Sequence, residues 1–195
     1  MTDATAPTAA APAAPPYDAE ALLAALTRAG VAARTVRHPP LRTVAESKAL
    51  RGDLGPGTHV KNLFLRRDPK SVAADGGPPF LLAVLGEDRA LSVNALARRL
   101  GAGRVSMAGE ADLWRVLGVR PGAVTPLGLF NARPGEVRAA FDAAALAGPG
   151  PVHVHPLTNE ATTALDPADL LRLLRGLGHA VEVVDLDAAP GGTGA

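Results

Sequence analysis

Two apolar segments separated by a polar stretch constrain the fold most strongly. The first is HVKNLFLRR (His59–Arg67) and the second is FLLAVL (Phe80–Leu85); both are rich in residues that favour buried β-strands. The stretch between them, Asp68–Pro79, contains two glycines and three prolines and is expected to form a polar loop. Together they predict a buried β-hairpin with a long connection.

Helix signals lie between further strand-like segments. Asp18 precedes Leu22, Leu23 and Leu26, which share one helical face, and Gly30 follows them. The capping box Thr43-Val44-Ala45-Glu46 predicts a short helix that ends near Gly52. Other helices are expected at 94–100, 113–117 and after Asp166-Pro167, and strands at 31–38, 104–108, 137–141, 152–155 and 180–186. Because the elements interleave without strict alternation, the expected fold class is mixed α+β, a mixed, largely antiparallel sheet flanked by helices.

Composition places the chain among globular proteins. Its 195 residues are 47% apolar with a formal net charge of +1, which argues against broad, sequence-blind binding to duplexes. The absence of cysteine removes disulfides and thiolate metal sites and makes a reducing cytoplasm the expected location. No apolar run approaches the ~20 residues that cross a bilayer, and the N-terminus lacks the features of a secretory signal.

Three segments are expected along the chain. Residues 1–16 consist of Ala, Pro and Thr apart from Met1 and one Asp, and are predicted to be a disordered tail. Residues 17–187 are predicted to form one domain without internal repeats, and residues 188–195, ending PGGTGA, a second disordered tail.

Lys61 and Asn62 are unusual inside an apolar strand. The chain has three lysines against seventeen arginines, and one of them follows Val60 here. A lysine can extend its ammonium group from an apolar strand into water. It can also supply a compact positive charge where negative charge develops in a reaction, and the sequence leaves both open.

Other candidates lie further along the chain. His153 and His155 are two residues apart on one strand, but no third ligand is evident, so no metal or other cofactor is expected. His155 alone could be structural or could handle protons. The segment VTPLGL (Val124–Leu129) is either a tight turn or a loop in which Gly128 lets a ligand approach backbone N–H groups. Thr158 and Asn159 could bind a sugar or an amino group, or only form a turn.

Four segments in order, KNLFL (Lys61–Leu65), GVRPGAVTPLGLFN (Gly118–Asn131), HPLTNEATT (His155–Thr163) and GHAVEVVDL (Gly178–Leu186), resemble the YbaK/ProX family of aminoacyl-tRNA editing domains. Within it they look most like freestanding prolyl-tRNA editing proteins. The resemblance implies a sheet curled toward a barrel and hydrolysis of the ester of mischarged tRNA(Pro), in particular Ala-tRNA(Pro). It implies mischarged tRNA as partner, with prolyl-tRNA synthetase as a further candidate, and no membrane.

The resemblance also assigns roles to residues. Lys61, His155 and Gly128 are the implied catalytic set. Substrate contacts are expected from Asn62, Val60, Phe64, Pro126, Leu129, Asn131, Thr158 and Asn159. RNA contact is expected from Arg98, Arg99 and Arg104, although these could equally be solvated helix charges.

The chemistry explains why such a site is needed. A proline-activating enzyme discriminates poorly against alanine, because a few missing methylenes cost only ~1–3 kcal/mol of binding. A second, smaller pocket can admit alanine, reject proline and hydrolyse what enters. The alternatives are a deacylase for cysteine or serine on tRNA, a noncatalytic aminoacyl-tRNA-binding or regulatory module, and a small-molecule metal hydrolase.

Overall fold

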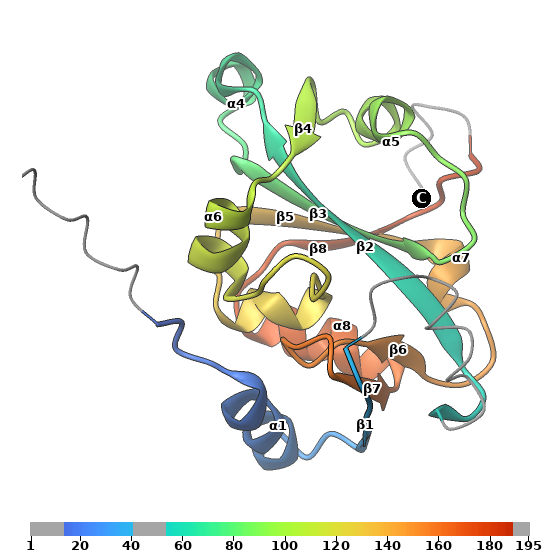
Figure 1. Ribbon diagram of the computed structural model, residues 1–195. Helices are drawn as coiled ribbons and strands as arrows, with labels where there is room; N and C mark the ends of the chain where they lie inside the picture. The colour runs from blue at the N-terminus through green and yellow to red at the C-terminus, as the bar shows by residue number, and fades with distance from the viewer. Residues whose placement is uncertain (1–13, 41–53, 189–195) are drawn as a thin grey trace, which may run out of the picture.

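The computed structural model describes residues 14–40 and 54–188, and these form a single sheet system with helices around it (Figure 1). The strands are β1 (Ala33–Arg37), β2 (Thr58–Arg67), β3 (Phe80–Gly86), β4 (Val105–Met107), β5 (Val137–Asp142), β6 (Val152–Val154), β7 (Ala161–Leu165) and β8 (Val181–Val184). The helices are α1 (Ala19–Arg28), α4 (Pro69–Asp75), α5 (Val93–Arg99), α6 (Glu110–Asp112), α7 (Ala143–Leu146) and α8 (Pro167–Gly176). A π-helical turn, η1 (Leu113–Leu117), and a 3-10 helix, η2 (Pro126–Phe130), complete the described elements.

The strand order is β1-β7-β6-β2-β3-β5-β8, with β4 added on β2. Four of the seven described pairings are antiparallel (β1–β7, β6–β7, β2–β3 and β2–β4), and three are parallel (β2–β6, β3–β5 and β5–β8). The predicted mixed, largely antiparallel sheet is therefore confirmed. The described sheet does not close into a barrel, because β1 and β8 lie at opposite ends of the order.

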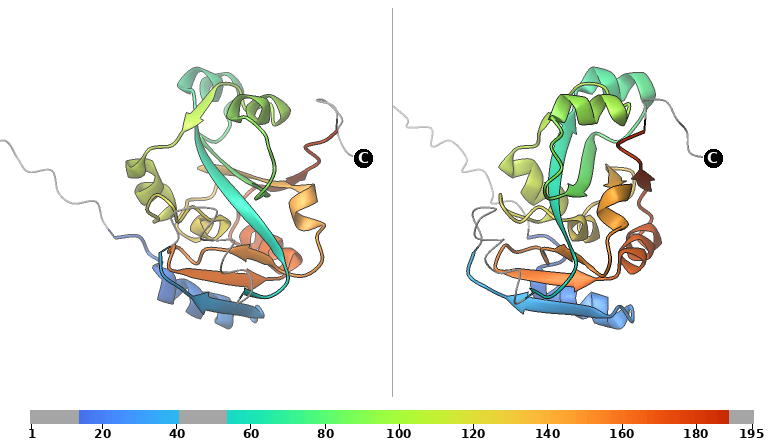
Figure 2. Two further views of the ribbon diagram at one scale, coloured as in Figure 1. Left: turned by 45° about the vertical axis from the view of Figure 1, so that its right-hand side comes forward. Right: turned by 90° about the vertical axis from the view of Figure 1, so that its right-hand side faces the viewer.

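Strand β2 pairs with three other strands and so connects the two parts of the sheet. Along one edge it pairs with β3 over seven residues, and on its other side it pairs with β6 at its start and with β4 at its end. Figure 2 shows the consequence: β1, β6 and β7 form one layer, and β3, β5 and β8 lie away from it, with β2 running between them. Within the described residues no strand pairs with β2 on the side between β6 and β4.

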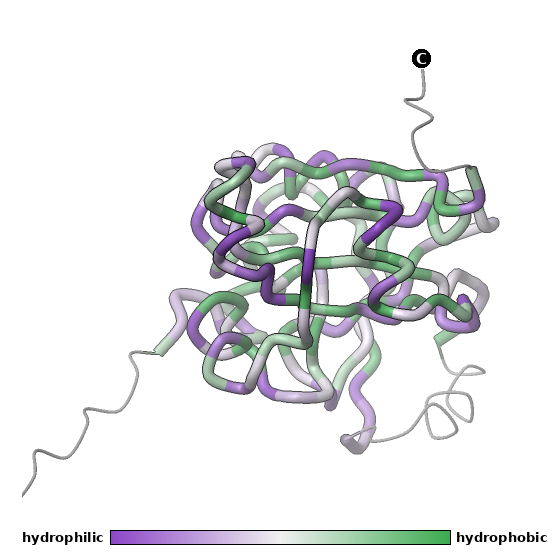
Figure 3. The backbone as a smooth tube through the Cα atoms, turned by 90° about the horizontal axis from the view of Figure 1, so that it is seen from above, coloured by the Kyte–Doolittle hydropathy of each residue, from purple (hydrophilic) through white to green (hydrophobic). Residues whose placement is uncertain are grey.

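Each face of the central strands packs into its own core. The larger cluster includes Phe64, Leu82 and Phe141, and it is closed by α1, η1, η2 and α8. The smaller cluster includes Leu65 and Leu81 and is covered by α5. Every residue from Phe80 to Leu85 is buried, as expected for a strand with apolar neighbours on both faces. Figure 3 shows hydrophobic stretches running through the middle of the molecule and hydrophilic residues on the connecting segments.

The predicted helix capped by Asp18 is confirmed, since its side chain accepts a hydrogen bond from Ala21 N. The predicted loop at 68–79 is wrong, because residues 69–75 form α4. Asp68 caps that helix, Pro69 occupies its first turn and Gly76 ends it in the left-handed region. Strand β7 and the short helix α7 were not predicted. The Thr43 helix and almost all of both predicted tails lie outside the described residues.

Within residues 14–40 and 54–188, no helix is both long enough and apolar enough to cross a membrane.

Asn131 ties the segment before α1 to the body of the protein. Its Oδ1 accepts from Tyr17 N at 2.8 Å, and its Nδ2 lies 3.0 Å from Tyr17 O and 3.1 Å from Leu117 O. The ring of Tyr17 also packs edge-on against Phe130 at 5.4 Å. The described hydrogen bonds of this amide are therefore all made with protein backbone.

We expect Asn131→Ala to lower the free energy of unfolding by about 2–3 kcal/mol, since three hydrogen bonds worth ~1 kcal/mol each are removed. Urea denaturation monitored by circular dichroism measures the change. Asn131→Asp keeps the acceptor for Tyr17 N but places a carboxylate oxygen against the carbonyl oxygens of Tyr17 and Leu117, so it should be at least as destabilised as Asn131→Ala. Equal stability of all three proteins would contradict this structural role.

Candidate functional site

Side chains of β2 alternate between the two cores, and this separates Lys61 from Asn62. Val60 and Phe64 contact the larger cluster, whereas Leu63 and Leu65 belong to the smaller one. Because successive strand residues point to opposite faces, Asn62 lies with the first pair and Lys61 with the second. Asn62 therefore lies on the side of the larger core cluster, and Lys61 lies on the side of the smaller one.

Asn62 joins β2 to the loop before η2. Its Nδ2 donates to Val124 O at 3.0 Å. Its Oδ1 is buried and accepts no hydrogen bond from any described residue. A buried acceptor without a partner costs free energy, so this oxygen is suited to receive a hydrogen bond from a ligand.

A small cavity of about 50 Å³ lies beside Asn62. Apolar side chains and polar groups from the start of β2, from β6 and from β7 share its wall. The lining residues are Leu54, His59, Val60, Asn62, Glu87, His153, Val154, His155 and Thr162. Its volume is on the order of one or two water molecules, which limits an occupant to a very small group.

His155 follows β6 and contributes its ring to this cavity. Its Nδ1 lies 2.9 Å from Ala161 O, and because a carbonyl only accepts, Nδ1 carries the proton. In the neutral ring Nε2 is then an acceptor, with no partner among the described residues. Burial lowers the pKa of His155; the Ala161 carbonyl opposes this, and His38, whose ring centroid is 6.4 Å away, lowers the pKa further.

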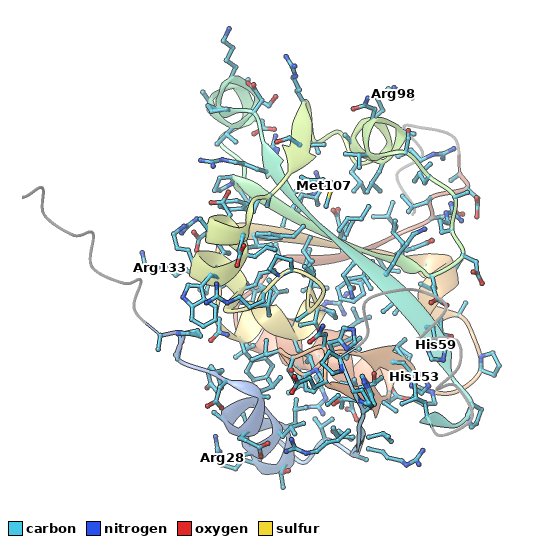
Figure 4. All side chains as sticks on the ribbon, in the orientation of Figure 1. Arg28, His59, Arg98, Met107, Arg133 and His153 are labelled. Atoms are coloured by element: carbon cyan, nitrogen blue, oxygen red, sulfur yellow. The ribbon has the colours of Figure 1, made fainter. Side chains whose placement is uncertain are left out.

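The rings of His59 and His153 stack where β2 meets β6. Their centroids are 4.6 Å apart with an interplanar angle of 7°, and Figure 4 shows the two side chains next to each other. His153 is 3% exposed, and burial lowers its pKa, with the Pro56 carbonyl opposing and Arg34 reinforcing the shift. A Cβ on Gly57 would lie 2.2 Å from His153 Nε2, so only glycine fits at this approach.

No group of three His, Cys, Asp or Glu side chains in the described ranges could hold a metal ion. Among residues 14–40 and 54–188, His153 and His155 have no third side chain of this kind placed to share a metal ion with them.

On the opposite face, Lys61 Nζ donates to the backbone carbonyl of Arg89. The guanidinium of Arg89 makes two hydrogen bonds with Asp187, at 2.8 and 2.9 Å, and its Nε lies 3.4 Å from Asp142 Oδ2. The hydrogen bonds with Asp187, and then the charge of Asp142, raise the pKa of Arg89. Lys61 thus supports the loop that connects β3 to α5.

A larger hollow of about 420 Å³ lies near this network. Its wall holds the carboxylates of Glu87, Asp88 and Asp142, and the charge of Arg89 there is already matched by Asp142 and Asp187. The small cavity is the candidate site because His155 and Asn62, whose Oδ1 has no partner among the described residues, both line it. His59 and Glu87 border both hollows.

Of the predicted site residues, Val60, Asn62 and His155 meet at the small cavity. Lys61 does not line it. Thr158 and Asn159 lie on the turn that follows His155, where Thr158 Oγ1 accepts from Glu160 N at 3.2 Å. Of the remaining predicted residues, Phe64, Pro126, Gly128 and Leu129 are buried, and Asn131 is half-buried where it binds Tyr17.

Gly128 occupies η2 rather than an open loop. Its N–H donates to Thr125 O at 3.1 Å, and Leu127 N donates to Thr125 Oγ1 at 3.3 Å. A Cβ at Gly128 would come 2.9 Å from Leu117 Cβ. The glycine therefore permits close packing of η2 on η1, and these two N–H groups are used within the turn.

Thr162 and Gly57 were not predicted from the sequence. Thr162 is 6% exposed on β7, which was itself not predicted, and its Oγ1 lies 2.9 Å from His38 Nε2. The order Gly57-Thr58-His59 before an apolar strand was the available signal for Gly57, because a glycine at a strand start often marks close backbone approach.

We expect His155 to titrate below its ordinary value of ~6.5. Following its Hε1 proton by NMR against pH, with His155→Gln for assignment, measures the midpoint. Because the folded-state pKa is depressed, the stability contributed by the neutral ring is present above pH ~6.5 and is lost as the pH falls through the folded-state pKa. A midpoint at or above ~6.5 would show that the ring is not desolvated.

Comparisons with known proteins match this chain over most of its length. The sequence profile described as the aminoacyl-tRNA editing domain matches residues 38–173. The chain is 37% identical over 163 residues to prolyl-tRNA synthetase associated domain-containing protein 1 of Danio rerio, covering 83% of this chain and 84% of the relative. It is 31% identical over 168 residues to the prolyl-tRNA editing protein ProX of Acetoanaerobium sticklandii, covering 86% and 96%.

Solved structures agree on the fold. A protein proposed to be a trans-editing enzyme for prolyl-tRNA synthetase superposes with a TM-score of 0.63 at 23% identity, covering 86% of this chain and 94% of that one. At this identity the likeness supports the architecture and nothing finer.

Proposed function

The chain belongs to the aminoacyl-tRNA editing domain family, and from that membership we propose that it is a deacylase that hydrolyses mischarged tRNA(Pro), with Ala-tRNA(Pro) as its substrate. The names of its relatives support the prolyl class of tRNA, since one is a prolyl-tRNA editing protein. The name of another relative associates it with prolyl-tRNA synthetase, which makes that enzyme a candidate partner.

The observation that carries the choice of amino acid is the size of the cavity beside Asn62. At about 50 Å³ its small volume favours a methyl group over the bulkier pyrrolidine ring. The apolar side chains of Val60 and Val154 offer contact to the methyl. Such a site rejects proline by steric exclusion, which discriminates more strongly than the loss of a methylene contact in a large pocket.

Two polar groups fit the rest of an alanyl ester. The unpartnered Oδ1 of Asn62 can accept a hydrogen bond from the α-ammonium group, and a hydrogen bond to a charged group is the stronger kind. The acceptor Nε2 of neutral His155 can hold the attacking water or a ribose hydroxyl. In the reaction water attacks the alanyl carbonyl, the bond to the ribose oxygen breaks, and that oxygen leaves as a hydroxyl after receiving a proton.

Purified protein should hydrolyse Ala-tRNA(Pro) at least ~100-fold faster than Pro-tRNA(Pro), because the ring does not enter the cavity. Time courses with tRNA(Pro) carrying labelled alanine, proline, cysteine or serine measure this. A preference for cysteine or serine would replace the proposed substrate. Tight binding of all four without turnover would instead indicate a noncatalytic module.

Asn62→Ala should lower kcat/KM for Ala-tRNA(Pro) by about 10- to 100-fold, as expected when a hydrogen bond to a charged group is removed. The variant also lacks the bond to Val124, so its thermal unfolding must be measured alongside. Thr27→Ala on α1, which also removes one side-chain hydrogen bond to a backbone carbonyl, is the comparison variant for the loss of a polar side chain away from the site. An active Asn62→Ala protein with unchanged kcat/KM would remove Asn62 from substrate binding.

Lys61, implied as catalytic by the family resemblance, is proposed to act by holding the loop that carries Glu87 and Arg89. Lys61→Ala should therefore reduce deacylation strongly, while Lys61→Gln, which keeps an N–H donor but no charge, should retain activity within about tenfold of the wild type. Deacylation rates and melting temperatures of both variants measure this. If Lys61→Gln folds normally and is as inactive as Lys61→Ala, the positive charge itself acts at the reacting ester.

A further inference from the structure

The end of the molecule formed by α4, β4 and α5 is seen in Figures 1 and 2. It carries more basic than acidic side chains: Arg66, Arg67, Lys70, Arg98, Arg99 and Arg104 against Asp68, Asp75 and Asp112. Lys70, Arg98 and Arg104 make no ion pair with any described residue, and Arg99 donates only to a backbone carbonyl, that of Ala188. The whole chain has a formal net charge of only +1, so this local excess of positive charge is balanced elsewhere.

A groove of about 350 Å³ lies between α4 and β4 at this end. Its wall is formed by Arg66, Arg67, Asp68, Pro69, Arg104, Val105 and Ser106. The antiparallel pairing of β2 with β4 puts Arg66 directly opposite Ser106, so their side chains share one face. Guanidinium groups together with a hydroxyl are the groups that bind phosphate oxygens.

The groove has a rigid base rather than a mobile one. Arg67 is 4% exposed, and its guanidinium donates to Ala102 O at 2.8 Å, to Pro78 O at 3.1 Å and to the carboxylate of Asp75. These bonds fix α4 against the segment that leads into β4. Arg104 N also donates to Ser71 Oγ at 3.2 Å, so the backbone beneath the Arg104 side chain is held in place.

Strand β2 sets the distance between this groove and the candidate active site. From His59, which lines the small cavity, to Arg66 there are seven residue steps, or about 23 Å of strand. A tRNA ends in four unpaired nucleotides, which span roughly 14 Å when stacked and more when extended. The first paired phosphates of the acceptor stem can therefore reach the groove when the 3′ ester lies at His155.

We propose that this groove, with Lys70 of α4 and Arg98 of α5 at the same end of the molecule, binds acceptor-stem phosphates of the tRNA whose 3′ ester occupies the small cavity. The proposal rests on the proposed deacylase function for the identity of the RNA. Arg66 contributes while remaining 3.2 Å from Asp112, and Arg104 and Lys70 supply charges that form no ion pair with a described acid. Asp68 is the one acidic residue among the described residues of the groove wall. Contacts of this kind position the stem without reading its sequence.

The test is binding of uncharged tRNA(Pro), measured by fluorescence anisotropy over a range of salt concentrations. The variant Arg98→Glu/Arg104→Glu should raise Kd at least tenfold and make the slope of log K against log salt shallower by about one for each phosphate that the protein no longer neutralises. Arg28→Glu and Arg133→Glu reverse exposed arginines elsewhere on the molecule (Figure 4) and should change Kd less than twofold.

A second measurement separates this surface from the deacylase activity. For the double variant, kcat/KM on Ala-tRNA(Pro) relative to kcat/KM on an alanylated CCA trinucleotide should fall at least tenfold. If the wild type hydrolyses neither substrate, the deacylase function fails while tRNA binding still tests the groove. The groove proposal is overturned if the double variant binds tRNA with the same Kd as the wild type. If the double variant keeps that Kd but binds prolyl-tRNA synthetase more weakly, the surface is a protein interface and the proposal is likewise overturned.

Discussion

The pairing of β2 with three different strands is the constraint on which the rest of the structure depends. The layer of β1, β6 and β7 joins the other strands through only two described β2–β6 pairs, Thr58↔Val152 and His59↔His153. At this junction the two histidine rings stack, and Gly57 is needed because any side chain there would meet His153. The candidate site lies at the same junction, so its geometry depends on the β2–β6 pairing and on the close approach of Gly57 to His153.

The alternation of β2 then distributes the polar groups. Asn62 lines the small cavity, donates to the loop before η2 and keeps one buried acceptor without a partner among the described residues. Lys61 lies on the opposite face and donates to the carbonyl of Arg89. The far end of the same strand presents Arg66 next to β4. The ten residues of β2 thus carry the small cavity at the start of the strand and the groove at its end. Their separation would suit a tRNA whose 3′ end enters the cavity while its stem lies along the groove.

Much of the fold could be predicted from local pattern. Apolar runs and caps identified β2, β3, α1 and α8, because burial and capping depend on nearby residues. Helix α4 resembles a loop in sequence because its prolines and glycines lie at its ends, where they fit a short helix. Strand β7 was hard to predict because its sequence, ATTAL, does not alternate between apolar and polar residues. It also pairs with β1, which lies far away in the sequence, and with β6, and the local sequence does not reveal these pairings.

The site was predictable only in part, for a physical reason. Both faces of β2 are apolar, so the pattern shows that Lys61 and Asn62 face opposite ways but not which of them meets His155. The role expected of Gly128 depended on free N–H groups, and these are used by contacts with Thr125 that sequence does not reveal. Thr162 and His59 reach the cavity through strand pairing, and neither carries a local signal of its own.

The most direct test of the account is a crystal structure with a non-hydrolysable alanyl-amide analogue of the 3′-terminal adenosine. The account predicts the alanyl methyl between Val60 and His155, with its ammonium nitrogen within about 3.2 Å of Asn62 Oδ1. An alanyl group bound instead on the Lys61 face, against Arg89 and Asp142, would contradict it.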